Sequence, residues 1–236
     1  MNSKKKICLI TGASSGIGYA IAKAMIEDNY TVVVTARRLD RLNTLKADPD
    51  NLFSGDLNDP DFQNTLVNAI FDKYGQCDYL FNCAGMLEVG PIEKIDIDKM
   101  AAMMRLNVES TFRLTYLILK RFKQQGFGHI INISSVLGTK VRPTAGAYAA
   151  SKFAMEALSE ALRLELVGSN IQVSCIEPGL VMTELHKDWE VHPKESMQIH
   201  EPLTVDNIVE TVRFIMKQPQ HVRIPNLMIL PKDHNI

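Results

Sequence analysis

The sequence predicts a single α/β domain: a doubly wound parallel sheet of seven strands with helices on both faces. Short apolar runs alternate with longer helical patterns along the chain, which is typical of parallel strands joined by crossover helices. The chain has 236 residues, of which 46% are hydrophobic, and this suffices for one core. No repeat, low-complexity tract or proline-rich linker interrupts it. We therefore expect one domain over residues 1–236.

The expected strands are seven short apolar runs. They lie at 7–10, 31–35, 52–55, 79–82, 129–134, 171–176 and 227–230. The two longest helical patterns between them span about 98–125 and 147–167. Right-handed crossovers favour the strand order 3-2-1-4-5-6-7, and ligands in such sheets bind beyond the carboxyl ends of the strands. Residues that follow a strand are therefore the candidates for a site.

A glycine-rich turn follows the first expected strand. The segment TGASSGIG occupies residues 11–18 and opens a helical pattern. A strand, a glycine turn and a helix N-terminus form a phosphate cradle, because free backbone N–H groups and the positive helix end face the anion. We expect Gly12 to permit the turn, Gly16 to let the backbone approach a pyrophosphate, and Gly18 to let the helix pack on the strand. The spacing differs from the common dinucleotide pattern G-x-G-x-x-G, and a glycine turn without a ligand is the alternative.

Tyr148 and Lys152 are four residues apart, and Ser135 lies thirteen residues upstream of Tyr148. Positions i and i+4 share one helix face. At a separation of about 5 Å and an effective dielectric constant near 20, Coulomb's law gives about 3 kcal/mol. We therefore expect Lys152 to lower the Tyr148 pKa by roughly two from its usual value of about 10, which would make the phenol a proton donor and acceptor near neutral pH. For the pair alone, a surface Tyr and Lys on an amphipathic helix is the alternative.

With these segments in place, the chain resembles the short-chain dehydrogenase/reductase family over about residues 5–183. Three glycine-containing motifs of the family are present: T-G-x-x-x-G-x-G at residues 11–18, N-x-A-G at 82–85 and P-G-x-x-x-T at 178–183. The family's helix asparagine matches Asn107 and its serine matches Ser135. Its Y-x-x-x-K motif matches Tyr148 and Lys152. The motifs occur in the family's order. The resemblance implies an NAD(P)-binding Rossmann domain and an oxidoreductase that interconverts an alcohol and a carbonyl.

The resemblance also implies the catalytic residues Asn107, Ser135, Tyr148 and Lys152. Tyr148 would give or take the proton, Ser135 would hydrogen-bond the carbonyl, and Lys152 would lower the phenol pKa and hold the nicotinamide ribose. Asn107 would hold a water that relays protons to Lys152, although an asparagine inside a long helix can also mark a kink or bond to backbone. Ser134 competes with Ser135, and the spacing to Tyr148 favours Ser135.

The residues after the second strand indicate which cofactor binds. A carboxylate here suits the ribose 2′-hydroxyl of NAD, whereas a guanidinium suits the 2′-phosphate of NADP. Arg37 and Arg38 stand here with no acid before Asp40, so we expect NADP, with NAD as the less favoured cofactor. The arginines could instead be exposed residues that open a helix, and Ser15 fills a slot where many NADP-preferring relatives carry a basic residue. Asp56, with Leu57, resembles the family's adenine-contacting pair, and a turn aspartate is the alternative.

The full set of expected cofactor contacts follows from these motifs. It comprises Gly12, Ser14, Ser15, Gly16, Ile17, Gly18, Arg37, Arg38, Asp56, Leu57, Asn82, Ala84, Gly85, Tyr148, Lys152, Pro178, Gly179, Val181 and Thr183.

The substrate is the least determined part of the sequence prediction. The irregular stretch at 180–202, which holds the only tryptophan, Trp189, is long for a compact domain; we expect a substrate lid, with an ordinary surface loop as the alternative. The side chains expected near the pocket are mostly apolar, which argues against a highly charged substrate. They are Leu87, Val89, Leu137, Val141, Pro143, Leu185 and Trp189.

Composition excludes several functions and partners. The formal charge is −1, so no basic field exists for nucleic acid or a membrane surface, and no apolar run is long enough for a membrane span. The four cysteines show no C-x-x-C pairing and the six histidines show no metal-ligand spacing, so we expect a cytoplasmic protein without a metal. A non-catalytic NADPH sensor or scaffold on the same fold is the alternative to the enzyme.

The family commonly assembles as dimers or tetramers through the two longest helices, so we expect a homodimer or homotetramer. The apolar side chains that could form the interface are Met100, Met103, Met104, Phe112 and Leu119. The alternative is that these side chains only cover the sheet.

Overall fold

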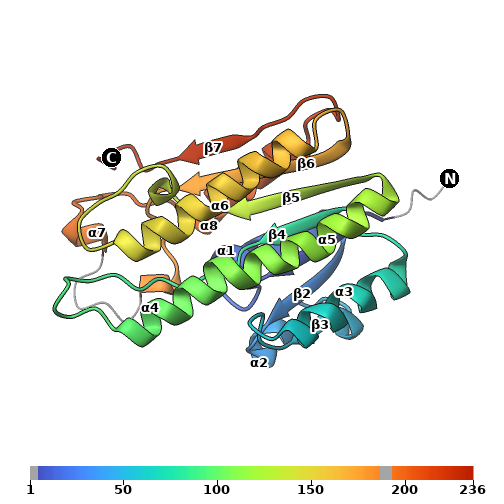
Figure 1. Ribbon diagram of the computed structural model, residues 1–236, viewed down its shortest axis with the longest axis horizontal. Helices are drawn as coiled ribbons and strands as arrows, with labels where there is room; N and C mark the ends of the chain where they lie inside the picture. Colours follow the sequence, from blue (N-terminus) through green and yellow to red (C-terminus); the bar gives the residue numbers. More distant parts are fainter. Residues whose placement is uncertain (1–4, 187–192, 236) are drawn as a thin grey trace.

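The structure, a computed structural model, describes residues 5–186 and 193–235. Its centre is one all-parallel sheet in the order β3-β2-β1-β4-β5-β6-β7, which confirms the predicted topology. The strands are β1 Ile7–Thr11, β2 Thr31–Ala36, β3 Leu52–Ser54, β4 Tyr79–Asn82, β5 Phe127–Ile133, β6 Asn170–Pro178 and β7 Asn226–Ile229. Each overlaps the run predicted for it, and the visible strand arrows point toward the side where α7 and the C-terminus lie (Figure 1).

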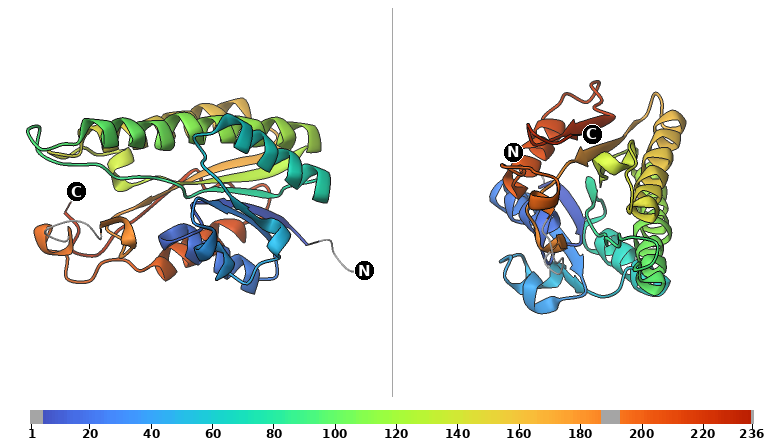
Figure 2. Two further views of the ribbon diagram at one scale, coloured as in Figure 1. Left: turned by 90° about the horizontal axis from the view of Figure 1, so that it is seen from below. Right: turned by 90° about the vertical axis from the view of Figure 1, so that its left-hand side faces the viewer.

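Helices form a layer on each face of the sheet (Figure 2). One layer contains α3 Pro60–Tyr74, α4 Ile97–Met104, α5 Thr111–Gln125 and α6 Gly146–Glu165. The other contains α1 Gly16–Glu27, α2 Leu39–Asn43 and α8 Val205–Met216, while the short helix α7, Pro193–Ser196, lies beyond the strand ends. The fold is thus the expected doubly wound α/β arrangement.

Two hydrophobic clusters fill the space between the sheet and its helix layers. In β1, Ile7 and Leu9 belong to the cluster under α3 and α5, whereas Cys8 and Ile10 belong to the cluster under α1 and α8. Successive strand side chains point to opposite faces. The strand β1 is apolar throughout because both of its faces are buried. Packing on both faces fixes the position of its last residue, Thr11.

The helical pattern at 98–125 is not one regular helix. It divides into α4, a wider π-helical turn over Arg105–Ser110, and α5. Helix α4 begins after Asp96, whose carboxylate accepts from the Lys99 N–H at 3.0 Å, and α5 ends at Gly126, whose φ of 86° is left-handed. The π-helical turn carries Asn107, so the irregularity falls at a predicted site residue.

The apolar side chains predicted for a subunit interface divide into two groups. Met103 and Leu119 are buried within the chain itself. Leu119 packs in the cluster on the sheet, whereas the Met103 sulfur accepts from the Glu88 N–H at 3.1 Å. Met100, Met104 and Phe112 are half-buried and remain available to a partner.

The stretch after β6 is only partly described. Val181 pairs with Leu203 in an isolated parallel bridge, a 3-10 turn spans Glu184–His186, and α7 follows. Trp189, which the sequence placed in a lid, lies outside the described residues. Within 5–186 and 193–235, no helix combines the length and the apolar character needed to span a membrane.

Candidate active site

A cavity of about 460 Å³ lies at the carboxyl ends of the strands. Its walls come from the glycine turn after β1, the ends of β2, β4, β5 and β6, the start of α6, and the C-terminal tail. Chain segments far apart in the sequence therefore meet at one place. The predicted site residues can be followed one by one along this cavity.

The glycine turn is held against the end of β4. Gly12 has a φ of 66°, and a Cβ there would lie 2.8 Å from the backbone N and Cα of Ala84, so both conformation and space require glycine. A Cβ on Gly18 would lie 2.6 Å from the Gly12 carbonyl oxygen, which explains the close approach of α1. The Thr11 hydroxyl accepts from the N–H groups of Cys83 and Ala84 at 3.1 and 3.0 Å. The turn is thus preformed with the geometry of a phosphate cradle.

Arg38 connects the end of β2 to the glycine turn. Its Nη2 donates to the Ser15 hydroxyl at 2.7 Å and to the Ser14 hydroxyl at 3.0 Å. The sequence analysis noted a serine at position 15 where many relatives carry a basic residue. The structure shows that the Arg38 guanidinium reaches this serine, so a cation is present there although it comes from the residue directly before α2.

Arg37 and Asp56 stand on the same wall. Both are exposed and both line the cavity. The Asp56 carboxylate accepts from the Asn58 N–H at 2.9 Å, which is the turn contact offered as the alternative for this residue. Leu57 beside it is buried.

Tyr148 lines the cavity near the start of α6, but the predicted direction of its pKa is wrong. Burial is the largest influence and raises the pKa of Tyr148 above its usual value of 10.0. The hydrogen bond with Ser135 and the charge of Arg142 both lower it without overcoming burial. The Lys152 ammonium lies 5.8 Å from the centre of the Tyr148 ring, over the ring face rather than beside the phenol oxygen. Tyr148 and Lys152 thus share a helix face, as their spacing predicted, but the ammonium does not contact the phenol oxygen as expected.

Lys152 is buried and its ammonium points to the sheet. Its Nζ donates to the Ile133 carbonyl at the end of β5, at 2.9 Å. Burial lowers the pKa of Lys152 from 10.5 to about 8, while Cys175, Cys83 and Glu156 act in the opposite direction. The pair therefore comprises a protonated phenol and a lysine that titrates slightly above neutral pH.

The two candidate serines have different surroundings. Ser135 lines the cavity with Tyr148 and lowers the pKa of Tyr148, and its hydroxyl accepts from the Leu137 N–H at 3.1 Å. The buried Ser134 hydroxyl has no hydrogen-bond partner among the described residues. The geometry supports Ser135, the serine that the spacing favoured, as the partner of Tyr148.

Asn107 lies behind the cavity wall and does not line the cavity. Its Oδ1 accepts from the Met86 N–H at 2.9 Å, and its Nδ2 donates to the Met86 carbonyl at 2.9 Å and to the Ser151 hydroxyl at 3.1 Å. These contacts are the backbone bonding and helix irregularity weighed as the alternative. They fix the loop after β4 against α6, and the water relay remains a prediction.

Asn82 differs from most of the expected cofactor contacts in its position, and its contact with a cofactor remains a prediction. It is buried inside the sheet region, where its Nδ2 donates to Thr115 at 2.9 Å and to Asn132 at 2.8 Å, and it does not line the cavity. The amide joins β4, α5 and β5, so it supports the strand end that positions the next residues. Its motif partners Ala84 and Gly85 do line the cavity.

The structure brings the other predicted residues to the cavity. Those lining it are Gly12, Ser14, Ser15, Gly16, Ile17, Gly18, Arg37, Arg38, Asp56, Leu57, Ala84, Gly85, Ser135, Tyr148, Lys152, Pro178, Gly179, Val181 and Thr183.

Several lining residues were not predicted from the sequence, and Arg142, Glu184 and His234 are among those with a titratable group. Arg142 lies between Val141 and Pro143, which were named as apolar pocket neighbours, and only a folded loop reveals that its charge reaches the cavity. Glu184 and His234 also line it. No motif or periodicity marks either position, since both lie in irregular segments after β6 and β7.

Comparison with known proteins decides the family. The sequence model of the family described as short chain dehydrogenase matches residues 6–194. The chain belongs to the short-chain dehydrogenase family. This short-chain dehydrogenase is 31% identical to an uncharacterised oxidoreductase of Staphylococcus saprophyticus, covering 100% of this chain and 99% of the relative. It is 32% identical to a probable NADP-dependent dehydrogenase of Haemophilus influenzae, covering 97% and 94%.

A solved structure supports the same relationship. The closed form of a serine dehydrogenase complexed with NADP+ superposes with a TM-score of 0.89 at 29% identity, covering 98% of this chain and 96% of the other. The Rossmann fold of this short-chain dehydrogenase is thus shared along nearly its whole length.

Proposed function

We propose that this short-chain dehydrogenase is an NADP-dependent oxidoreductase that interconverts an alcohol and a carbonyl, with Tyr148 as the general acid and base. The observation that carries the proposal is that Ser135, Tyr148 and Lys152 line the same cavity as the glycine turn. A proton donor and a phosphate cradle in one cavity suit hydride transfer with a nicotinamide dinucleotide.

The cavity residues fit such a cofactor. The preformed turn at Gly12 offers backbone N–H groups at the start of α1, and Arg38 offers a guanidinium at the end of β2. Two relatives named above carry NADP in their descriptions. When bound, the nicotinamide would supply or accept the hydride.

The chain's own groups perform the proton chemistry. For carbonyl reduction, the Tyr148 O–H donates its proton to the carbonyl oxygen, and the Ser135 hydroxyl donates a hydrogen bond to the same oxygen. Because burial raises the pKa of Tyr148, the phenol stays protonated at neutral pH and is ready to act as the acid. The Lys152 ammonium, held by the Ile133 carbonyl, does not contact the phenol oxygen, but at 5.8 Å from the ring centre its charge would favour the negative charge that develops on the phenol.

Tyr148→Phe tests the proposal. Steady-state oxidation of NADPH with a panel of carbonyls should fall by at least about a hundred-fold, because general acid catalysis contributes roughly 10²–10⁴-fold. NADPH affinity from fluorescence titration should stay within a few fold, since the ring still packs. Tyr30→Phe is the matched control, because Tyr30 does not line the cavity and belongs to neither helix of the proposed interface.

The result also separates the enzyme from a non-catalytic sensor. NADPH binding by the wild-type protein with no turnover of any carbonyl would favour a sensor or scaffold. Near-normal turnover in Tyr148→Phe would reject Tyr148 as the acid.

Two further proposals concern assembly and substrate access. Half-buried Met104 and Phe112, with exposed Tyr116 and Phe153 on α5 and α6, support a homodimer or homotetramer through these helices. Light scattering that gives a monomer at micromolar concentration would reject it. The described parts of the 180–202 segment line the cavity, which supports its proposed role as a substrate lid.

A further inference from the structure

The substrate end of the cavity carries charge that the proposed proton transfer does not use. Among the described lining residues the carboxylates are Asp56 and Glu184, and both belong to the end near Arg38. The wall near Tyr148 has Arg142 and His234 instead. Asp233, next to His234, is the nearest acid: its charge raises the pKa of His234, but it does not line the cavity and its Oδ2 accepts from the His200 N–H at 2.7 Å. Positive and hydrogen-bond-donating groups on a wall without a lining acid indicate a place for an anion.

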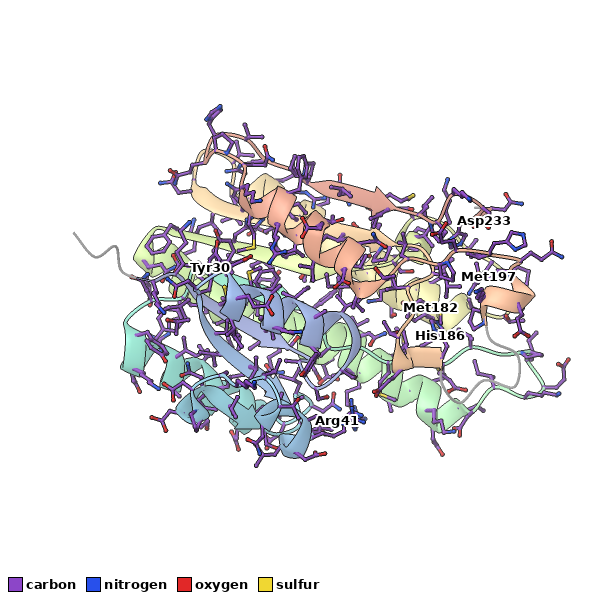
Figure 3. All side chains as sticks on the ribbon, turned by 180° about the vertical axis from the view of Figure 1, so that it is seen from behind. Tyr30, Arg41, Met182, His186, Met197 and Asp233 are labelled. Carbon is purple, nitrogen blue, oxygen red and sulfur yellow. The ribbon has the colours of Figure 1, made fainter. Side chains whose placement is uncertain are left out.

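Arg142 lies in the loop between the 3-10 turn Val136–Gly138 and α6. Its carbonyl accepts from the Ala145 N–H at 3.4 Å, and its Nη1 donates to the Met197 sulfur in the segment after α7 at 3.0 Å. A thioether is a weak acceptor, and no carboxylate pairs with Arg142 within the described chain. Most of the donors of this guanidinium are therefore available. Figure 3 shows Met197 at the same end of the molecule as His186 and Asp233, far from Tyr30.

The Arg142 guanidinium acts on the same space as the phenol. Its charge lowers the pKa of Tyr148, and Tyr148 in turn raises the pKa of Arg142 against the larger opposing effect of burial. It also contributes, after burial, to a lowered pKa of His234. The His234 ring packs against Gly179 at the end of β6, where a side chain would collide with its Nδ1. Arg142 and His234 thus stand together over the cavity that Tyr148 enters.

We propose that Arg142 binds a carboxylate of the substrate, so that the substrate pair of this enzyme is a hydroxy acid and the corresponding oxo acid. The proposal rests on the proposed function and specifies its substrate class. In the reduction, the hydride of NADPH adds to the carbonyl carbon, the Tyr148 proton goes to the carbonyl oxygen, and NADP+ and the hydroxy acid are released. The carboxylate is unchanged and serves only to orient the substrate.

A carboxylate suits this position better than a phosphate. The planar guanidinium pairs with a carboxylate through two parallel hydrogen bonds. A phosphate dianion would require a second cation, and the nearby Lys152 is buried and bonded to the Ile133 carbonyl. The predicted apolar pocket is therefore corrected: Val141 and Pro143 do not line the cavity, whereas Arg142 between them does.

The test compares oxo acids with their methyl esters. Pyruvate, acetoacetate and levulinate, each paired with its ester, vary the distance between the carbonyl and the carboxylate. Wild-type kcat/KM should favour at least one acid over its ester on the order of ten- to a hundred-fold, the range expected for a charge-assisted pair. Arg142→Gln should remove this preference, through KM mainly, and leave the rate with the ester within a few fold. Arg142→Lys should restore part of it.

Lys140→Gln is the matched control, because exposed Lys140 lies in the same loop outside the cavity and its loss removes the same charge. Its acid-to-ester ratio should equal that of the wild type. Arg142 lies in a surface loop where its guanidinium is only partly covered, so the variants should fold, and equal melting temperatures would confirm this.

Binding gives a readout that does not depend on turnover. Acetoacetate in the presence of NADP+ cannot react because both are oxidised, and calorimetry should detect its binding to the wild type and a loss of at least about ten-fold in Arg142→Gln. An acid preference that survives Arg142→Gln, or esters that match acids in the wild type, would overturn the carboxylate site and leave the oxidoreductase intact. If no carbonyl is turned over, the proposed function fails, and calorimetry alone decides whether Arg142 binds the carboxylate.

Discussion

Arg38 and Glu184 form an ion pair across the mouth of the cavity, with Arg38 Nη1 3.5 Å from Glu184 Oε2. Arg41 Nη1 lies 3.5 Å from the other carboxylate oxygen. The pair joins the end of β2 to the segment after β6, although the residues are far apart in the chain. All three side chains are about half exposed, so the pair contributes little to stability. Its consequence lies in binding, because Arg38 is the guanidinium proposed for the 2′-phosphate.

Glu184→Gln should therefore tighten NADPH binding. A carboxylate that shares Arg38 with a phosphate competes for the cation and repels the anion, whereas a neutral amide does neither. Exposed charge pairs are worth roughly 0.2–1 kcal/mol, so the gain should be about two- to five-fold. NADH affinity should hardly change. Fluorescence titration of both cofactors measures the effect, and a weaker NADPH complex in the variant would show that Glu184 assists binding.

Arg38→Asp should weaken NADPH binding and turnover and leave NADH comparatively unaffected. Charge-assisted hydrogen bonds are worth about 1.5–3 kcal/mol, so the ratio of kcat/KM for NADPH over NADH should fall at least about ten-fold. Lys94→Asp, an exposed charge reversal in the loop before α4, serves as control. Equal kcat/KM for the two cofactors in the wild-type protein would recast Arg37 and Arg38 as surface residues.

The fold was predictable because each strand is buried on both faces. β1 reads as a continuous apolar run, and the glycine turn directly after it marks its carboxyl end. Once the strand order follows from right-handed crossovers, the motifs after strands must converge. Gly12, Ser135 and Tyr148 accordingly reach one cavity.

The sequence predictions and the structure differ mainly where the direction of a side chain determines what that side chain contacts. Asn82 belongs to a correct motif, but its amide points to Thr115 and Asn132 instead of the cavity. Lys152 shares a helix face with Tyr148, yet burial outweighs the charge that was expected to lower the phenol pKa. Arg142 stands in an irregular loop with no periodicity to indicate its direction. The spacing of residues in the sequence determines which of them are neighbours on a helix. The degree of burial around a titratable group and the conformation of a loop, in contrast, become known only from the structure.

Carbonyl reduction should slow as pH rises through about 8. Burial lowers the pKa of Lys152 to about 8, so its ammonium is present below this pH and is lost above it, whereas Tyr148, with a raised pKa, keeps its proton throughout. The free enzyme's kcat/KM should then fall roughly ten-fold per pH unit above 8, since this parameter reports the ionisations of the free enzyme. Lys152→Met should be slow at every pH and lack the inflection. A flat wild-type profile between pH 7 and 9.5 would contradict a role for the ammonium.

His129 should make the protein less stable in acid, independently of the active site. It is buried on β5, where its Nε2 lies 2.9 Å from the Ser174 hydroxyl, and burial lowers its pKa from 6.5 to about 4. Between these values the unfolded chain binds the proton and the folded protein does not, so stability is lost as pH falls from 6.5 to 4. At about 1.36 kcal/mol per pKa unit the loss approaches 3 kcal/mol. Urea unfolding across this range should show a smaller loss in His129→Gln, while exposed His221→Gln should follow the wild type. Identical pH dependence in all three proteins would mean that His129 takes up a proton without unfolding the chain.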